Sequence, residues 1–239
     1  MFAGDEVVVI GGSSGIGLGV ARAVLREGGR VTIVGRSLER LEQALDAIGL
    51  GAGVRTLSAD VSREQDVERL FAQVGPVDHV VVTAIDAVYQ PVRALCVEDA
   101  RRVIDSKLIA ALLIAARGAS SIRPSGSLTL TSGIAAYRPS PGGAVVAAVN
   151  GALEALARAL ALELAPVRVN AVSPGWVDTP IWEVVAGERK GAVLEGMAAR
   201  LPVGRIGSVD DVADAILFLM HNRYTTGTVL QVDGGHRLI

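Results

Sequence analysis

Short apolar runs alternate along the chain with longer segments in which apolar residues recur at helical spacing. The β-branched runs at residues 7–10 and 31–34, for example, are each followed by such a segment. The runs are continuous rather than alternating in polarity, which is typical of strands covered on both faces. Strands that alternate with helices to the end of a chain predict an α/β fold with a doubly wound parallel sheet.

The same pattern assigns most of the chain to individual elements. We expect strands at about residues 7–10, 31–34, 54–57, 80–83, 127–131, 167–172 and 228–232. We expect helices at about residues 16–27, 38–48, 63–74, 100–116, 145–164 and 209–220. No proline- or serine-rich linker and no internal repeat divides these segments, so residues 1–239 are expected to form a single domain.

Composition excludes several classes of protein. Hydrophobic residues make up 50% of the chain, which is enough for a large core and excludes disorder as the main state. The net charge of −2 gives no basic excess for nucleic acid. A single cysteine, Cys96, excludes an internal disulfide and any multi-cysteine metal site. We expect Cys96 to be an inert thiol. The three histidines, His79, His221 and His236, do not have the spacing of metal ligands, so we expect them to have structural roles.

No segment has the pattern of an export signal or of a membrane span. The apolar run at residues 108–116 is far shorter than the roughly 20 residues that a bilayer requires. The first residues are acidic, with Asp5 and Glu6, whereas a signal peptide begins with a basic region. We therefore expect a cytoplasmic protein that binds neither membrane nor nucleic acid.

A glycine-rich turn separates the first strand from the first helix. Its sequence is Gly11-Gly12-Ser13-Ser14-Gly15-Ile16-Gly17. Gly11 permits a sharp exit from the strand, whereas Gly15 and Gly17 let a pyrophosphate and the sheet approach the backbone. Free N–H groups at the helix start then bind the anion. This strand–turn–helix context predicts a dinucleotide site in a Rossmann-type fold, lined by Gly11, Ser13, Ser14, Gly15, Ile16 and Gly17.

The end of the second strand indicates which dinucleotide binds. NAD-binding proteins usually carry an acidic residue there, but this chain has Arg36 followed by Ser37. Arg36 can pair with a 2′-phosphate, so the sequence favours NADP(H) over NAD(H), with both residues at the cofactor. The alternative is a solvated arginine at a helix start. Asp60, after the third strand, either accepts a hydrogen bond from adenine or caps the next helix.

Several motifs resemble those of the short-chain dehydrogenase/reductase family, nearly from end to end. They are the glycine turn, Asp60-Val61, residues 168–175 with their continuation to residue 180, and residues 201–205 and 232–235. The resemblance implies a cofactor site that also includes Asp60, Val61, Ala84, Pro174, Gly175, Val177 and Thr179. It implies that Val177 and Thr179 contact the nicotinamide carboxamide. It also implies a substrate lid within residues 181–206, where Trp182 and Met197, with nearby Trp176, would line an apolar pocket.

The catalytic residues of the family are only partly present. The family transfers a hydride between nicotinamide and a carbonyl or alcohol carbon, using a tyrosine, a lysine four residues later, a serine and an asparagine. Ser132 falls on the serine position of this chain. Val146 falls on the tyrosine position, Asn150 on the lysine position and Lys107 on the asparagine position. The Tyr-x-x-x-Lys pair is therefore expected to be absent.

Lys107 and Asn150 retain the family's two side-chain types in exchanged positions. Only two lysines occur in the chain, and a lysine on an apolar helix face must find a partner or lower its pKa. We therefore expect Ser132, Lys107 and Asn150 to be catalytic, with Lys107 as proton donor. The alternatives are a bound water as donor and a Lys107 that reaches solvent or pairs with Asp105. Tyr137, on the loop after Ser132, could also swing in as the donor. Tyr89 and Asp86 are expected to face the cleft mouth, where Asp86 could act as a base.

Three functions fit these features. The first is an NADP(H)-dependent oxidoreductase with a non-standard proton donor, acting on an apolar carbonyl or alcohol. The second is a catalytically impaired NADP(H)-binding sensor or partner subunit, and the third is a dehydratase or isomerase using Lys107 or Asp86. Helices near residues 100–116 and 145–164 are apolar nearly all round. The resemblance implies that they pair with their copies in a homodimer or homotetramer.

Overall fold

One parallel sheet organises the computed structural model, which describes residues 2–49 and 53–239. Its strands lie in the order β3-β2-β1-β4-β5-β6-β7. Their bounds are β1 Glu6–Ile10, β2 Arg30–Gly35, β3 Val54–Ser58, β4 Val77–Val82, β5 Ile122–Thr131, β6 Arg168–Pro174 and β7 Val229–Val232. Every pair of neighbouring strands is parallel. The chain therefore has the expected single-domain α/β fold with a doubly wound sheet.

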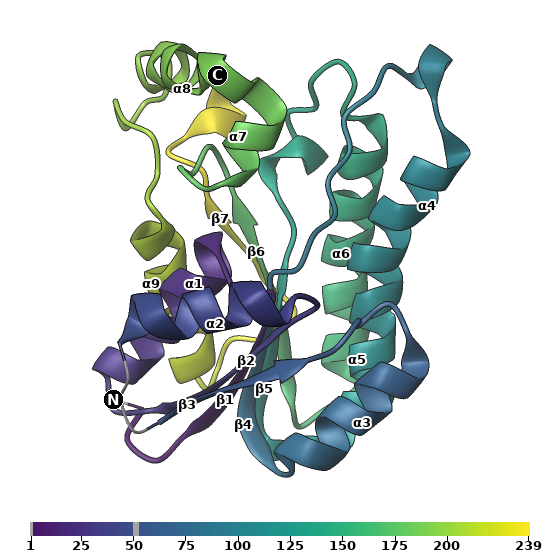
Figure 1. The fold of residues 1–239 in the computed structure, drawn as a ribbon, viewed down its shortest axis with the longest axis vertical. Helices are drawn as coiled ribbons and strands as arrows, with labels where there is room; N and C mark the ends of the chain where they lie inside the picture. The colour runs from purple at the N-terminus through teal and green to yellow at the C-terminus, as the bar shows by residue number, and fades with distance from the viewer. Residues whose placement is uncertain (1, 50–52) are drawn as a thin grey trace.

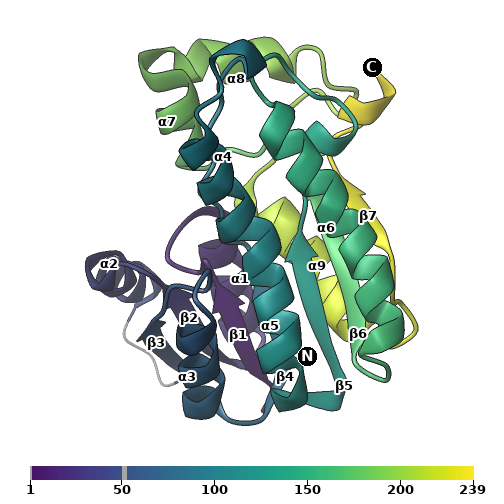
Figure 2. The same ribbon diagram turned by 90° about the vertical axis from the view of Figure 1, so that its right-hand side faces the viewer.

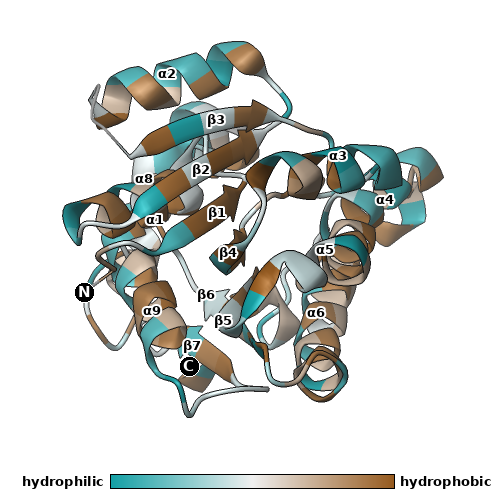
Figure 3. Cartoon of the chain, turned by 90° about the horizontal axis from the view of Figure 1, so that it is seen from below, coloured by the Kyte–Doolittle hydropathy of each residue, from teal (hydrophilic) through white to brown (hydrophobic). Residues whose placement is uncertain are grey.

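Helices cover both faces of the sheet (Figure 1, Figure 2). Their bounds are α1 Gly15–Arg26, α2 Leu38–Ile48, α3 Glu64–Val74, α4 Val97–Ile104, α5 Ala110–Gly118, α6 Ala144–Glu163, α7 Ile181–Ala186, α8 Lys190–Ala198 and α9 Val209–His221. Viewed along the sheet, α1 and α9 lie on one side, and α3, α5 and α6 lie on the other (Figure 3). Helices α7 and α8 lie apart from both layers, at the top of Figures 1 and 2.

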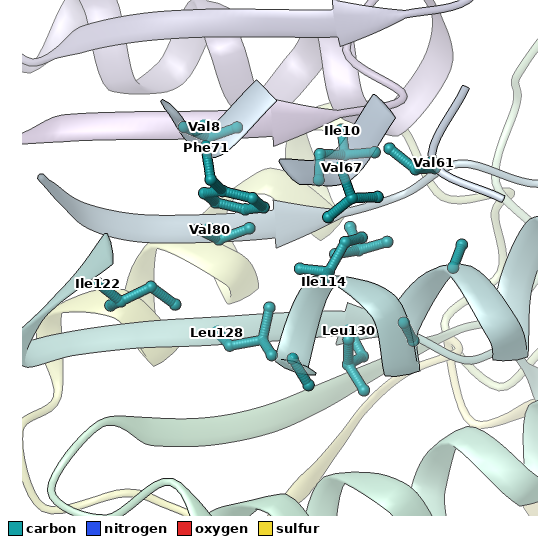
Figure 4. Close-up of a cluster of buried hydrophobic side chains, with 14 of the residues drawn as sticks. Val8, Ile10, Val61, Val67, Phe71, Val80, Ile114, Ile122, Leu128 and Leu130 are labelled. Carbon is teal, nitrogen blue, oxygen red and sulfur yellow. The ribbon is translucent and has the colours of Figure 1, made fainter. Parts of the chain in front are cut away.

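The strands are apolar on both sides because each side faces a layer of helices. In β1, Val7 and Val9 belong to the core beneath α1 and α9, whereas Val8 and Ile10 belong to the core beneath α3 and α5. Figure 4 shows the second core, in which Phe71 of α3 packs near Val8. Each fully buried side chain of this size contributes roughly 1.5–3 kcal/mol of transfer free energy.

The centre of the sheet is the point at which the chain reverses its direction of winding. β1 lies beside β4, and from there the strand order runs outward in both directions. The two strand ends are tied together by Thr83, whose Oγ1 donates to the carbonyls of Ile10 (3.1 Å) and Gly11 (3.2 Å). Ligands of open α/β sheets bind outside the carboxyl ends of the strands at such a point.

The helix expected at residues 100–116 is interrupted in the structure. It consists of α4, a π-helical turn at Asp105–Ile109, and α5. The apolar pattern could not distinguish this turn from a continuous α-helix, because the turn keeps the helical direction. π-Helical turns occur frequently at functional sites, and Lys107 lies in the middle of this one.

Strand β5 also begins five residues before its expected start at residue 127. Pro124 and Gly126 disfavour a strand in this segment, and its pairing with β4 shifts register between Val77 and His79. Tertiary pairing with β4 therefore extends the strand beyond what the local sequence indicates.

Among the described residues, one helix has the length and mean hydropathy of a membrane span, namely α6. It packs on the sheet and buries Leu153, Ala157 and Leu160 in the core. These are the contacts of a core helix, so α6 gives only weak evidence for a membrane.

Candidate active site

A cleft of about 1690 Å³ lies at the carboxyl ends of the strands. The glycine turn after β1 and the end of β2 line one part of it, which we call the nucleotide end. The π-helical turn, the segment after β5 and the inner face of α6 line another part, which we call the reaction end. The cleft therefore brings together segments that are far apart in the sequence.

The glycine turn fits a pyrophosphate. Gly15 has φ +51°, and a Cβ there would project to 3.6 Å from Thr179 across the cleft. The side chain of Ser14 does not cap α1, and the first helical hydrogen bond of this turn runs from the Leu18 N–H to the Ser14 carbonyl at 3.2 Å. The amides of the first turn are thus left for an anion, as a helix N-terminus provides.

Close packing explains two further glycines of the turn. A Cβ at Gly17 would lie 2.4 Å from the Gly11 carbonyl, so α1 can approach the sheet only without a side chain there. Gly11 has φ +84°, and its Cβ would lie 2.5 Å from the Ala84 amide nitrogen. The remaining predicted residues of the turn, Ser13, Ser14 and Ile16, and Ala84 after β4 all line the cleft.

Arg36 and Ser37 lie at the nucleotide end, where the sequence predicted them. The Arg36 guanidinium is 3.4 Å from an Asp86 carboxylate oxygen, and its side chain is 62% exposed. Ser37 caps α2, because its hydroxyl accepts from the Arg40 N–H at 3.3 Å. Arg36 is therefore an exposed cation that lines the cleft and pairs with the Asp86 carboxylate.

Asp60 also lines the cleft but does not cap α3. Its Oδ1 accepts from the Ser62 N–H (3.1 Å) and hydroxyl (2.7 Å), whereas Arg63 occupies the cap position of α3. The capping alternative for Asp60 is therefore wrong, because the Asp60–Ser62 turn adds residues before the helix. Val61 is buried and lines the cleft.

The segment after β6 forms the wall opposite the glycine turn. Pro174, Gly175, Val177 and Thr179 all line the cleft. Gly175 has no room for a side chain, since a Cβ would lie 2.6 Å from the Asp233 Cα. The chain is thus held close to the segment after β7, which fixes the position of the wall.

Lys107, Asn150 and Ser132 meet at the reaction end. Lys107 Nζ donates to the Ser132 carbonyl (3.1 Å) and to Asn150 Oδ1. The Lys107 residue is only 6% exposed. Asn150 Nδ2 in turn donates to the Gly133 carbonyl at 3.3 Å. Lys107 and Asn150 therefore bind each other, and Lys107 neither reaches solvent nor pairs with Asp105.

Burial lowers the pKa of Lys107 to about 7. Both oxygens that hold the ammonium group are neutral, and no carboxylate among the described residues lies within ion-pair distance of it. Nothing therefore compensates the loss of hydration, which disfavours the charged form of a buried lysine. At neutral pH Lys107 can both hold and release a proton.

Glu154 is a site residue that the sequence analysis missed. It lies one helical turn after Asn150 and is 6% exposed. Its Oε1 accepts from the Ser132 hydroxyl at 2.8 Å, and its Oε2 accepts from the Tyr137 hydroxyl at 2.6 Å. The only sequence signal was its spacing of four residues after Asn150, which does not by itself distinguish Glu154 from a solvated carboxylate.

The other candidate proton donors lie elsewhere. Tyr137 is bound to Glu154, and this hydrogen bond is the main cause of the raised pKa of its phenol. Asp86 pairs with Arg36, and its N–H donates to the Ser106 hydroxyl at 3.1 Å. Tyr89 lines the cleft. None of the three contacts Lys107.

Two tryptophans stack at the entrance to the reaction end. The rings of Trp176 and Trp182 are 4.4 Å apart and nearly parallel at 16°. Trp182 Nε1 donates to the Val177 carbonyl at 2.8 Å, and Met197 of α8 lines the cleft nearby. All three residues therefore line the cleft, where the sequence placed them.

The histidines and Cys96 have varied surroundings. His79 is buried, contacts the Ser127 hydroxyl at 2.9 Å, and has its pKa lowered to about 4 mainly by burial. The His221 ring packs on Phe2 at a tilt of 53°, whereas His236 lines the cleft and lies edge-on to Trp176. Cys96 is exposed before α4. The part of the chain that the structure describes holds no cluster of three or more metal-ligating side chains.

Known proteins share both the sequence motifs and this fold. A family model described as "Enoyl-(Acyl carrier protein) reductase" matches residues 10–237. The chain belongs to the short-chain dehydrogenase/reductase family. One member, "Short-chain dehydrogenase/reductase malC" of Malbranchea aurantiaca, is 35% identical over 97% of this chain and 94% of its own. Members of this family use nicotinamide cofactors and act on small-molecule substrates.

Solved structures of the family match the whole fold. "Structure of MalC Reductase/Diels-Alderase from Malbranchea aurantiaca" superposes with a TM-score of 0.93 at 33% identity, covering 100% of this chain and 98% of that one. A "small-chain dehydrogenase in complex with NADPH" superposes with a TM-score of 0.84 at 34% identity, covering 99% and 100%. The second neighbour supports the assignment of a nicotinamide cofactor.

Proposed function

We propose that this chain is an NADP(H)-dependent oxidoreductase that interconverts a carbonyl compound and an alcohol without the family's tyrosine. The bound nicotinamide would supply or accept the hydride. Lys107 handles the proton, and Ser132 and Asn150 hold it in place. The observation that carries this proposal is the buried ammonium group of Lys107, held by two neutral oxygens at the reaction end of the cleft.

The chemistry of Lys107 suits a proton donor. An acid works best when its pKa lies near the working pH, and general acid catalysis contributes typically ~10²–10⁴-fold. Of the three hydrogens of the ammonium group, two go to Ser132 and Asn150, so one remains for a substrate oxygen. Val146, at the position aligned with the family's tyrosine, lines the same cleft but has no proton to give.

NADP(H) is the cofactor that we assign in preference to NAD(H). Arg36 lies at the end of β2, and its exposed guanidinium can donate two hydrogen bonds to a 2′-phosphate. No acidic side chain occupies positions 35–37 to bind a ribose hydroxyl instead. The NADPH complex of the structural neighbour supports this preference.

The outer surface of α5 and α6 favours a homo-oligomer. Leu112 of α5 is 41% exposed and Leu162 of α6 is 82% exposed. Helices with apolar residues on their outer face are usually buried against a partner. We propose that these faces pair between copies in a homodimer or homotetramer in the cytoplasm. Light scattering after size exclusion should give a multiple of 24.7 kDa at micromolar protein, and a monomer would contradict this.

Cofactor titration followed by a substrate screen tests the proposed function. We expect NADPH to bind more tightly than NADH by fluorescence. We then expect oxidation of NADPH with at least one member of a panel of diketones, quinones and aldehydes. Tight binding without turnover on any of them would instead support the sensor or partner subunit. Failure to bind either cofactor would contradict the proposal as a whole.

A further inference from the structure

The buried carboxylate of Glu154 has no part in the function proposed above. It is held by two hydroxyl groups, those of Ser132 and Tyr137, at 2.8 and 2.6 Å. No lysine, arginine or histidine among the described residues forms an ion pair with it. A buried carboxylate without a charged partner is costly unless hydrogen bonds compensate it. Glu154 is therefore held in place by these two donors.

This contact determines where the single hydrogen of the Ser132 hydroxyl points. Two acceptors lie within reach of Ser132 Oγ: Glu154 Oε1 at 2.8 Å and the Asn150 carbonyl at 3.1 Å. A serine hydroxyl has one hydrogen and two lone pairs. Because the Ser132 hydroxyl donates to Glu154 Oε1 and the Asn150 carbonyl can only accept, the hydrogen stays inside the protein. Ser132 then offers only lone pairs to the cleft that it lines.

Lys107 and Ser132 thus offer opposite partners to a substrate. The ammonium group keeps one hydrogen for the cleft, and it lies 3.1 Å from the carbonyl of Ser132 itself. A substrate bound beside Lys107 Nζ meets a hydrogen-bond donor there and a hydrogen-bond acceptor at the nearby Ser132 Oγ. A plain ketone satisfies only the donor, whereas an α-hydroxy ketone satisfies both.

We propose that Glu154 is a positioning residue that makes Ser132 a hydrogen-bond acceptor, so that the site selects carbonyl substrates with an adjacent hydroxyl or N–H group. This inference rests on the proposed function, because it assigns the substrate class of the same site. The carbonyl oxygen binds Lys107, and the neighbouring donor binds Ser132 Oγ.

The surroundings of Glu154 agree with this role. Tyr137, in the segment after β5, directs its hydroxyl to Oε2, and Glu154 is the main reason that the pKa of the phenol is raised. Arg158 on α6 and Gln231 on β7 also act on Tyr137, both in the opposite direction. Lys107 reaches the group from the other side, through the Ser132 backbone. The Glu154 carboxylate therefore links α6 to the segment after β5 through two hydrogen bonds.

Binding of a matched pair of ketones to the NADPH-loaded protein tests the inference. The pair is 2-hydroxyacetophenone and propiophenone, which differ by a hydroxyl in place of a methyl group. Leaving a buried hydrogen-bonding group unpaired costs enough to change affinity about 5–150-fold. We expect the hydroxy ketone to bind more tightly by a factor in this range. The factor should fall to about one in Ser132→Ala and decrease in Glu154→Gln. Glu163→Gln, at an exposed carboxylate of the same helix, should leave it unchanged.

A spectroscopic titration supplies a second readout that needs no turnover. The chain contains three tyrosines, so phenol ionisation can be followed by absorbance. Glu154→Gln should lower the pKa of one phenol, that of Tyr137, whereas Glu163→Gln should not. Equal affinity of the wild type for the two ketones, or an unchanged ratio in Glu154→Gln, would overturn the inference. A retained ratio with no oxidation of NADPH would instead contradict the proposed function and leave the selectivity standing.

Discussion

The nucleotide end and the reaction end of the cleft are built in different ways. At the nucleotide end the backbone contributes most of the site, through glycines without room for a Cβ and amides left free at the start of α1. At the reaction end, buried side chains contribute the site, and each polar group is bound to another: Lys107 to Asn150, and Ser132 to Glu154.

This difference explains which parts of the family pattern the chain retains. A backbone cradle depends on glycine at fixed positions, because a Cβ at Gly17 would meet the Gly11 carbonyl. A side-chain network depends only on complementary donors and acceptors, which can be exchanged between positions. Lys107 and Asn150 together fill the space with one donor group and one acceptor group. The reaction end can therefore change its residues while the nucleotide end stays the same.

Replacing Lys107 by methionine should produce the largest effect and separate the two ends. We expect Lys107→Met to lower the rate of carbonyl reduction by ~10²–10⁴-fold, which is the contribution of a general acid. The affinity for NADPH, measured by fluorescence, should stay within about twofold because the cradle is untouched. Lys190→Met is the control, since Lys190 pairs with Asp178 outside the cleft. A variant of Lys107 with wild-type turnover would assign the proton to another donor.

The pH dependence of stability should show the cost of burying the Lys107 ammonium group. The pKa of Lys107 is about 7, below the ordinary 10.5. Between these values the unfolded chain binds the proton and the folded chain does not, so the free energy of unfolding rises with pH across that window. Below pH 7 both states are protonated and the gain is absent. At 1.36 kcal/mol per pKa unit, the rise is at most about 5 kcal/mol.

Urea denaturation at several pH values between 7 and 10 measures this rise. We expect the difference in unfolding free energy between wild type and Lys107→Met to change across the window, in favour of the wild type at high pH. Burial lowers the pKa of His79 to about 4, so the effect of His79 on the unfolding free energy is confined to pH values below this range. Parallel curves for the two proteins would show that Lys107 titrates at its ordinary pKa.

Replacing Arg36 should affect the nucleotide end alone. Hydrogen bonds to charged groups contribute about 1.5–3 kcal/mol, so Arg36→Ala should weaken NADPH binding by roughly 10–150-fold. NADH lacks the phosphate, and its affinity should change little. Titration of both cofactors gives the ratio directly. The rate at saturating NADPH should be retained, and an equal loss of affinity for both cofactors would show that Arg36 does not read the 2′-phosphate.

The smallest expected change concerns the cradle. Gly17→Ala forces the backbone apart at Gly11 and should destabilise the fold by about 1–3 kcal/mol, as overpacking does. NADPH affinity should decrease with it. Gly151→Ala is the matched control, because a Cβ there meets nothing within 4 Å. Thermal unfolding with and without NADPH measures both effects. Equal stability and affinity in the two variants would argue against a close cradle.

The alternation of strands and helices and the nucleotide end could be predicted because their signals are local. The glycine turn lies within seven residues, and Arg36 directly follows its strand. The pair Lys107 and Asn150 was also predicted, from the expectation that the two residue types are exchanged relative to the family. The contact itself joins residues 43 positions apart and became visible only in the fold.

The rest of the reaction end could not be read from the chain. Glu154 binds residues 17 and 22 positions away, and on its own helix it resembles a solvated carboxylate. The π-helical turn around Lys107 has the same apolar spacing as an α-helix, so periodicity did not indicate it. In both cases a tertiary contact, rather than local preference, decides the structure.

Nitrogen NMR of lysine side chains tests most directly whether Lys107 is prepared to release a proton at neutral pH. The chain contains two lysines, so ¹⁵N-lysine labelling gives two Nζ signals, and a Lys190→Met sample assigns them. We predict that one signal titrates near pH 7 and belongs to Lys107. The Lys190 signal should titrate above its ordinary value, because a hydrogen bond to Asp178 raises the pKa of Lys190. Two signals that both remain charged up to pH 10 would contradict the account.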